Sequence, residues 1–346
     1  MAGVRDRVGK RVAEFLSGQR VILDDISPDV GALLDPLGDF MAGGKRLRAM
    51  FLYWGWRSAG RPDGEEIVSA AAAMEFLQAC ALVHDDVMDR SDSRRGRPAI
   101  HRQFESLHEA TRWAGGSADF GAAAAILIGD LCLSWADELL LASGLPADGL
   151  SRGKPVYDVM RTELMAGQYL DMLEQVRRND RVEAALQVAT YKSAKYTIER
   201  PLHLGAAMAG AAPAAIEALR HYGVSLGRAF QLRDDLLGVY GDPRETGKPA
   251  GDDLREGKRT VLVTLALSEL GDADRARFAA GLESGDPAGV PRLRGLLDTT
   301  SARAQMEDLI ATEAAAARAA LTEAPLDPQA AEVLAQLVDV AVRRGS

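Results

Sequence analysis

The sequence predicts an all-α fold, and three features of its composition support this. Alanine-rich stretches such as residues 70–73 and 122–125 have the strongest intrinsic preference for helix. Runs of β-branched residues long enough to build a sheet are scarce. Of the 346 residues, 47% are hydrophobic but only 5% are aromatic, which indicates one large core of small and aliphatic side chains. Because no linker or repeat divides the chain, we expect a single domain over residues 1–346.

Apolar residues recur at the helical period along most of the chain. The predicted helices span residues 4–16, 44–56, 65–89, 99–113, 117–143, 148–176, 181–211 and 213–240. Breaks rich in Gly and Pro separate several of them, at residues 60–64, 94–98, 144–146 and 211–213. Connections this short favour antiparallel neighbours in one helical bundle.

A long polar interruption follows the helix predicted over residues 213–240. Residues 241–258 combine glycine, proline and charged residues, which suit a mobile loop better than a core. Beyond this loop, residues 259–342 read as smaller helices that complete the bundle.

Charge, cysteine usage and hydropathy exclude several classes of protein. A net charge of -9 with dispersed basic residues argues against nucleic acid as a partner. Cys80 and Cys132 lie in apolar helical segments without metal-binding spacing, so we expect buried thiols in a reducing cytoplasm. The N-terminus lacks the apolar region of a secretory signal, and no uncharged apolar run reaches the roughly 20 residues of a membrane span. The sequence therefore predicts a soluble cytoplasmic protein.

The helix predicted over residues 65–89 ends in a cluster of acidic residues. Asp85 and Asp89 stand at i and i+4, so both carboxylates project from one helix face. Two like charges there destabilise the helix unless a cation lies between them. Oxygen ligands favour a hard ion such as Mg²⁺, which commonly binds carboxylates together with phosphates. A single motif of this kind is more often a solvated helix end.

A second acidic pair, Asp234 and Asp235, lies near the end of the helix predicted over residues 213–240. Two such pairs at matching ends of long apolar helices are much harder to explain as solvated surface. Together they could hold several metal ions between two helices of a bundle.

Basic residues lie close to the same motifs in the sequence. Lys45 and Arg48 are placed at i and i+3 near a predicted helix start, where free backbone N–H groups also attract anions. Arg94 and Arg95 follow the first acidic motif, and Lys248 and Lys258 follow the second. Each could be an ordinary surface charge, but acids and bases that alternate in this way indicate a metal-bridged polyphosphate.

The order of these motifs resembles that of the trans-prenyl diphosphate synthase family, which includes farnesyl and geranylgeranyl diphosphate synthases. The matching segments are GGKRLR, Gln78, DDVMDRSDSRRG, YKSAKY, FQLRDD and TGKPAGDDLREGKRT, and they run through nearly the whole chain. The resemblance implies a single-domain isoprenoid-synthase helical bundle around a central cavity and a homodimer. It also implies a Mg²⁺-dependent prenyltransferase that joins isopentenyl diphosphate to dimethylallyl, geranyl or farnesyl diphosphate.

The resemblance assigns roles to individual residues. The implied metal ligands are Asp85, Asp89 and Asp234, which would hold three Mg²⁺ ions; the catalytic set adds Asp86, Lys192, Gln231 and Asp235. The allylic diphosphate would contact Arg94, Lys192, Ser193, Gln231, Lys248 and Lys258. Isopentenyl diphosphate would contact Lys45, Arg48, Gln78 and Arg95. Gly238 departs from the family pattern, since many members have a third aspartate there, yet we expect activity to survive.

Product length is expected to depend on the helix that carries the first acidic motif. Cys80 and Ala81 lie about one turn before Asp85, and both are small where farnesyl synthases have aromatic side chains. Leu77 and Met74 continue the row and should limit further extension. The resemblance thus favours geranylgeranyl diphosphate as the product. The alternative product is farnesyl or a somewhat longer diphosphate. In the alternative, Cys80 is an ordinary packing residue and a different helix closes the pocket.

Three other classes compete with this interpretation. A class I terpene cyclase also uses a DDxxD motif, but Asn179 and Asp180 are followed by Glu183 and Gln187 where a cyclase motif needs Ser and Glu. A non-catalytic synthase subunit predicts decay of the acidic motifs, which are intact. A purely structural bundle leaves the ordered acids and bases without a cause.

Overall fold

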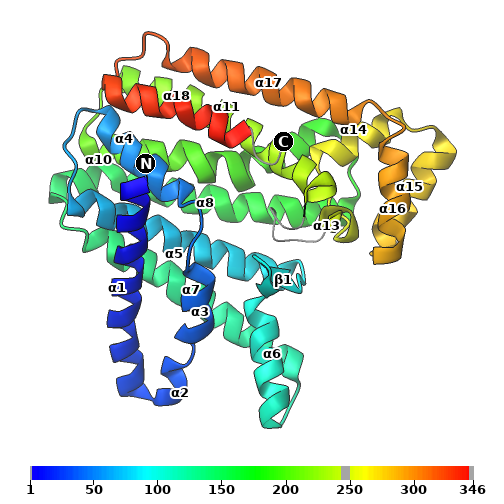
Figure 1. Ribbon diagram of the computed structural model, residues 1–346, viewed down its shortest axis with the longest axis horizontal. Coiled ribbons are helices and arrows are strands. Elements are labelled where there is room, and N and C mark those ends of the chain that lie inside the picture. The colour runs from blue at the N-terminus through cyan, green and yellow to red at the C-terminus, as the bar shows by residue number, and fades with distance from the viewer. Residues whose placement is uncertain (1, 243–249, 343–346) are drawn as a thin grey trace.

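The computed structural model describes residues 2–242 and 250–342 and confirms the all-α prediction (Figure 1). Within these ranges the strands are β1 (Ser93–Arg94) and β2 (Arg97–Pro98), an antiparallel pair with Ser93 opposite Pro98. The first half of the chain forms α1 (Ala2–Ile26), α2 (Pro28–Gly31), α3 (Leu34–Met41), α4 (Leu47–Ser58), α5 (Glu65–Met88), α6 (Ile100–Thr111), α7 (Ser117–Leu141) and α8 (Ala147–Arg177). The second half forms α9 (Val182–Val188), η1 (Ala189–Glu199), α10 (Arg200–Ala209), α11 (Pro213–Tyr240), α13 (Asp252–Arg255), α14 (Val261–Glu269), α15 (Asp272–Ser284), η2 (Pro287–Gly289), α16 (Val290–Leu297), α17 (Ala302–Leu321) and α18 (Pro328–Val342).

Helix α5 lies inside the larger of two clusters of buried apolar residues. Every residue from 67 to 77 is buried, because α1, α4 and α7 cover different faces of this helix. Phe76 packs edge-on against Phe15 of α1 and Trp135 of α7, with ring centroids 5.0 and 6.2 Å away. Among the described residues, α5 is the one helix long and apolar enough to cross a membrane, and 78% of its most apolar window is buried inside the bundle. The packing thus accounts for its apolar composition.

The helix predicted over residues 181–211 is three consecutive segments, α9, η1 and α10, and the middle one is a π-helix. Segment η1 packs between α8 and α11. A Cβ on Gly167 of α8 would lie 2.4 Å from the backbone nitrogen of Lys192, and a Cβ on Gly227 of α11 would lie 2.6 Å from Cα of Ala194. These two glycines let η1 approach both neighbours closely. π-Helical turns of this kind are frequent at functional sites.

The small helices predicted after residue 259 are α14 to α18. The second cluster of buried apolar residues joins the last turns of α11 to α14, α15, α16 and α17, with Phe278 fully buried in it. In Figure 1, α17 and α18 lie along α11, while α15 and α16 form one end of the molecule. The expectation of one domain over residues 1–346 stays a prediction, and α11 contributes to both clusters.

One predicted helix end and one predicted helix start near the N-terminus are wrong. The helix expected over residues 4–16 continues to Ile26, although Val21, Ile22 and Ile26 are exposed and disturb the apolar period. The helix expected from residue 44 begins at Leu47 because Gly43, Gly44 and Arg46 adopt left-handed backbone conformations, with φ of 76°, 91° and 52°. Apolar periodicity carries no information on either feature.

Candidate functional site

The two acidic motifs lie at the C-terminal ends of α5 and α11. Asp85 and Asp86 are in the last turn of α5, and Asp89 is its C-cap. Asp234 and Asp235 lie in the last two turns of α11. Because carboxylates are unfavourable at the negative end of a helix dipole, both motifs depend on positive charge from elsewhere.

The first motif obtains this charge from three basic residues. The Lys192 ammonium donates to Asp85 at 3.1 Å, and Arg94 Nη2 lies 3.2 Å from the other oxygen of the same carboxylate. Arg94 Nε also donates to Asp86 at 2.9 Å. Burial opposes ionisation of Asp85, but the charges of Lys192, Lys258 and Arg94 outweigh burial and hold its pKa well below the ordinary value. Asp85 is therefore ionised and already paired.

Lys258 connects the first motif to the segment that follows the second. Its ammonium lies 2.9 Å from Asp89 and 2.7 Å from Glu256, which also accepts a 3.0 Å hydrogen bond from Ser91. Burial and the neighbouring charge of Asp85 raise the pKa of Asp89 in spite of Lys258. Lys258, which is expected to contact the allylic diphosphate, thus lies beside Asp89, and its role with substrate stays a prediction; Glu256 was not anticipated.

The second motif has a different electrostatic environment. Asp235 is 5% exposed and accepts a 2.7 Å hydrogen bond from Gln231. Burial, followed by the negative charges of Asp253 and Asp234, raises the pKa of Asp235 to about 8. The carboxyls of this motif thus crowd one another, and a cation would relieve their repulsion.

Asp253 lies beside Gly238, the position where many members of the family have a third aspartate. A Cβ on Gly238 would lie 1.9 Å from Oδ2 of Asp253, so the carboxylate of Asp253 fills the space beside this glycine. A backbone hydrogen bond of 3.0 Å from Gly251 to the Gly238 carbonyl fixes α13 against α11. Sequence reasoning missed Asp253, although an acid within the polar loop was visible; the contact depends on how that loop folds back.

The π-helical segment η1 brings Lys192 and Ser193 toward the first motif. Lys192 also binds Asp171 of α8, with 2.6 Å between Nζ and Oδ2. Burial opposes protonation of Lys192, but Asp85 and Asp171 together raise its pKa. Ser193 is half-buried beside it. Asp171 is a second residue that sequence reasoning missed, since nothing in the local pattern of α8 distinguishes it.

The residues expected to bind isopentenyl diphosphate come from the start of α4, from α5 and from the turn between β1 and β2. Arg48 donates to Thr197 at 2.7 Å and stacks 4.5 Å from the ring centroid of Tyr196, while Lys45 is exposed. The Arg95 guanidinium would lie 3.7 Å from a Cβ on Gly44. Partial burial, opposed by Glu75, combines with the positive charges of Arg46, Arg94 and Arg48 to lower the pKa of Arg95. This region is a concentration of positive charge that suits a polyanion.

Comparison with known proteins identifies the family. A sequence profile described as Polyprenyl synthetase matches residues 31–295. The chain is 34% identical over 245 residues to a short chain isoprenyl diphosphate synthase of Methanothermobacter thermautotrophicus, covering 71% of this chain and 70% of that protein. It is 36% identical over 239 residues to a (2E,6E)-farnesyl diphosphate synthase of Mycobacterium tuberculosis, covering 69% of this chain and 61% of that protein.

A solved structure extends this likeness to the whole chain. The geranylgeranyl pyrophosphate synthase of Corynebacterium glutamicum, complexed with isoprenyl diphosphate and magnesium, has a TM-score of 0.95 and 40% sequence identity, covering 99% of this chain and 98% of that chain. The chain belongs to the polyprenyl synthetase family. Membership makes it a prenyltransferase of isoprenoid biosynthesis and confirms the family predicted from the motifs.

The residues of this synthase that are expected to set product length differ in environment. Met74 and Leu77 are fully buried, whereas Ala81 is half-buried, as is Gln78. Cys80 is 4% exposed, and its Sγ lies 3.8 Å from Nδ1 of His84. Burial raises the pKa of the Cys80 thiol to about 12. The assignment of these residues to the tail pocket stays a prediction.

The oxygen-only donors of this synthase fit magnesium that arrives with a diphosphate. Among the described residues, no three His, Cys, Asp or Glu side chains form a group that could hold a metal ion. Mg²⁺ usually binds one or two carboxylates and completes its octahedron with water and substrate phosphate, so no closed protein cage is required. Asp85, Asp89 and Asp234 would hold it.

Lys248 was expected to contact the allylic diphosphate but lies outside the described residues, as does the stretch 243–249 of the expected loop.

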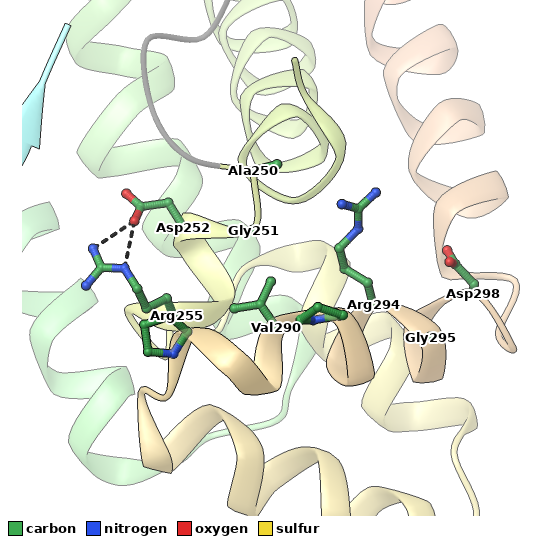
Figure 2. Close-up of a pocket in the computed structure, with 10 residues that line it drawn as sticks. Ala250, Gly251, Asp252, Arg255, Val290, Arg294, Gly295 and Asp298 are labelled. Carbon is green, nitrogen blue, oxygen red and sulfur yellow. Dashed lines mark hydrogen bonds and ion pairs between the residues drawn. The ribbon is translucent and has the colours of Figure 1, made fainter. Parts of the chain in front are cut away.

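A surface hollow of about 520 Å³ lies between α13 and α16 (Figure 2). Its charged side chains already have partners: Arg255 is joined to Asp252 at 2.8 Å, Arg294 lies 5.3 Å from the ring centroid of Tyr240, and Asp298 accepts a 2.8 Å hydrogen bond from Tyr240. The two contacts with Tyr240 fasten α16 to the end of α11, and the pair of Arg255 and Asp252 lies within α13. The charged groups of the hollow are therefore engaged in contacts within the protein.

Proposed function

We propose that this polyprenyl synthetase condenses isopentenyl diphosphate with allylic diphosphates, in the presence of Mg²⁺, to form geranylgeranyl diphosphate. The observation that carries the proposal is the presence of two separate charged regions around α5. Carboxylates and basic residues alternate at one, and at the other the charges of Arg46 and Arg48 act on Arg95. One region suits a metal-bound diphosphate and the other a diphosphate held by basic residues alone.

The allylic diphosphate would bind at the ends of α5 and α11. Asp85, Asp89 and Asp234 would hold the metal, and we expect three ions in the complex. When bound, Mg²⁺ would neutralise the diphosphate leaving group and so favour ionisation of the allylic carbon–oxygen bond. Arg94 and Lys192, which bind Asp85 in the structure, would turn to the diphosphate oxygens as the metal takes the carboxylates.

Further side chains would complete the allylic site. Asp86 and Asp235 would support the ligands from behind, since both are almost fully buried beside them. Gln231 bonds Asp235 and orients it. Ser193, Lys248 and Lys258 would add contacts to the diphosphate. Exclusion of water by the segment around residues 241–258 would protect the carbocation.

Isopentenyl diphosphate would bind to Lys45, Arg48, Gln78 and Arg95. Among the described residues Gln78 Oε1 is buried without a hydrogen-bond partner, so its amide has unused bonding capacity. From this position the double bond can attack the allylic carbon, and loss of a proton then gives the trans product. By resemblance to the family, the released diphosphate would accept that proton.

The product length is proposed from the small side chains at Cys80 and Ala81. Leu77 and Met74 are fully buried farther along α5 and would limit the chain to about twenty carbons. Relatives that make farnesyl and other short-chain diphosphates agree with the reaction and leave the length open between them.

We also propose that the enzyme is a cytoplasmic homodimer. Helices α7 and α8 expose large apolar side chains, and exposed apolar patches often mark contacts between proteins. These are Ile126 (46% exposed), Leu127 (58%), Leu141 (61%), Met165 (50%), Tyr169 (64%), Met172 (40%) and Val176 (76%). A second copy of the chain would cover them, and sedimentation velocity would measure the dimer.

The proposal is tested by supplying purified protein with radiolabelled isopentenyl diphosphate and each allylic primer in turn. Mass analysis should show geranylgeranyl diphosphate as the main product, only when Mg²⁺ is present. Products that never exceed fifteen carbons would assign a farnesyl synthase instead. Cyclic hydrocarbons from the allylic substrate alone would overturn the proposed reaction.

A further inference from the structure

Arg46 differs from its neighbours in the segment GGKRLR. Lys45 is exposed and Arg48 is half-buried, but the side chain of Arg46 is only 6% exposed. Its guanidinium donates to Glu75 of α5, with 2.7 Å between Nη1 and Oε2, and its Nη2 donates to the Met41 carbonyl. Arg46 thus turns into the protein where the residues beside it turn out.

The ion pair joins three helices at one point. Met41 is the last residue of α3, Arg46 is the N-cap of α4, and Glu75 lies in the middle of α5. A charged pair this deeply buried is costly unless its hydrogen bonds are satisfied, and a non-glycine residue in the left-handed region adds backbone strain. Arg46 has both features, with φ of 52°. Backbone strain of this kind persists only where the surroundings fix it.

The segment that contains Arg46 also carries Lys45 and Arg48, which are assigned to the isopentenyl diphosphate site. Gly43 and Gly44 also have positive φ, so the chain reverses sharply before Lys45. The Arg95 guanidinium lies against Gly44 and donates to the Phe40 carbonyl at 2.8 Å. One turn along α5 from Glu75 lies Gln78. Lys45 and Arg48 flank Arg46 in this segment, so their placement depends on the anchor formed by Arg46 and Glu75.

We propose that the buried Arg46–Glu75 ion pair is a positioning device for the isopentenyl diphosphate site, which acts through Lys45 and Arg48 without touching the substrate. Glu75 also offsets part of the repulsion among Arg46, Arg48 and Arg95 when no substrate is present. The inference rests on the proposed function, since it assigns the second diphosphate to this region.

The test uses three variants and one matched control. Glu75→Gln and Arg46→Lys keep the size of the side chains, while the double variant Arg46→Met/Glu75→Leu replaces the pair by apolar groups that can remain buried. Arg318→Met is the control, because Arg318 of α17 also bonds a carboxylate and a backbone carbonyl of another helix, Asp339 at 2.8 Å and Ala335 at 3.2 Å. Michaelis constants for both substrates, kcat and melting temperature are measured for each.

We expect the three variants to raise the Michaelis constant for isopentenyl diphosphate roughly tenfold or more and to change that for the allylic substrate less than about twofold. The control should change neither. Equal changes in both constants, or a lower melting temperature with both constants unchanged, would show that the pair is structural only and overturn the proposal.

A binding measurement separates this inference from the proposed function. Calorimetric titration with isopentenyl diphosphate alone needs no turnover, so it reports on the site even if the reaction differs from the one proposed. Weaker binding by the double variant supports the positioning role. Binding equal to that of the parent protein by a folded double variant overturns it, whereas a parent protein that binds but forms no prenyl product contradicts the proposed function alone.

Discussion

The ends of α5 and α11 carry similar acidic motifs in opposite electrostatic states. At the end of α5, Asp85 lies within 3.2 Å of Lys192 and Arg94, and its pKa is held well below the ordinary value. At the end of α11, burial and the charges of Asp253 and Asp234 raise the pKa of Asp235 to about 8. Basic residues already pair with the first motif, whereas in the part of the chain that the structure describes Asp235 accepts its hydrogen bond from the neutral Gln231. A metal ion bound as proposed would displace Lys192 and Arg94 from Asp85 and would relieve the repulsion around Asp235.

Removing one acid from either motif should produce the largest effect. We expect Asp85→Ala and Asp234→Ala each to lower turnover roughly a thousandfold or more, because each removes a metal ligand beside the leaving group. The radiolabelled isopentenyl diphosphate assay measures the rate, circular dichroism checks the fold, and Asp6→Ala, an exposed acid, is the control. Near-normal turnover of Asp234→Ala alone would mean that only the end of α5 binds metal.

The second-largest effect should come from Asp253, which fills the space beside Gly238. We expect Asp253→Asn to lower turnover roughly a hundredfold, since a carboxylate beside the metal would be lost. Gly238→Asp alone should destabilise the protein, because the new side chain would collide with Asp253. The double variant Gly238→Asp/Asp253→Ala should recover part of the activity, and no recovery would show that the two positions are not equivalent.

A change at Lys45 tests whether the two diphosphate regions bind different substrates. Lys45→Ala should raise the Michaelis constant for isopentenyl diphosphate through loss of a charge-assisted contact of roughly 1.5–3 kcal/mol. Steady-state kinetics with each substrate varied in turn measures the effect. A change confined to the allylic substrate would show that the two sites are exchanged.

In the absence of metal, removing the charge of Asp235 and removing that of Asp85 should change the free energy of unfolding in opposite directions. The native state keeps a proton on Asp235 up to about pH 8, while the unfolded chain releases it near the ordinary value of 3.8. The native state therefore binds more protons over this window, and the favourable contribution of this carboxyl is lost as pH rises toward 8. At pH 8 in a chelator, Asp235→Asn should raise the free energy of unfolding by roughly 1–3 kcal/mol.

Asp85→Asn should lower the free energy of unfolding under the same conditions, because it removes one of the two carboxylates that Lys192 and Arg94 each bind and leaves Lys192 with Asp171 and Arg94 with Asp86. Denaturant titrations of both variants at pH 5 and pH 8 measure the free energy of unfolding. The increase caused by Asp235→Asn should be smaller at pH 5 than at pH 8. Equal losses for both variants at pH 8 would remove the contrast.

The smallest change in rate should accompany the change in product length. Cys80→Phe should shift the main product toward farnesyl diphosphate, and Leu77→Ala should lengthen it, because both side chains lie along α5 before Asp85. Chromatography of the products measures the distribution. An unchanged distribution in both variants would place the end of the pocket on another helix, with Cys80 as ordinary packing against α7.

The sequence by itself determined what depends on local spacing and residue type. Alanine-rich periodicity predicted most helices, and the order of acids and bases predicted the family and the residues that meet at the ends of α5 and α11. Only the tertiary structure decided which distant groups complete them. Asp253 beside Gly238, Asp171 on Lys192 and Glu75 on Arg46 are contacts between separate elements. The π-helical segment that carries Lys192 likewise depends on close contacts with glycines of α8 and α11. Contacts between distant elements do not affect the local periodicity of the sequence, so a sequence pattern cannot predict them.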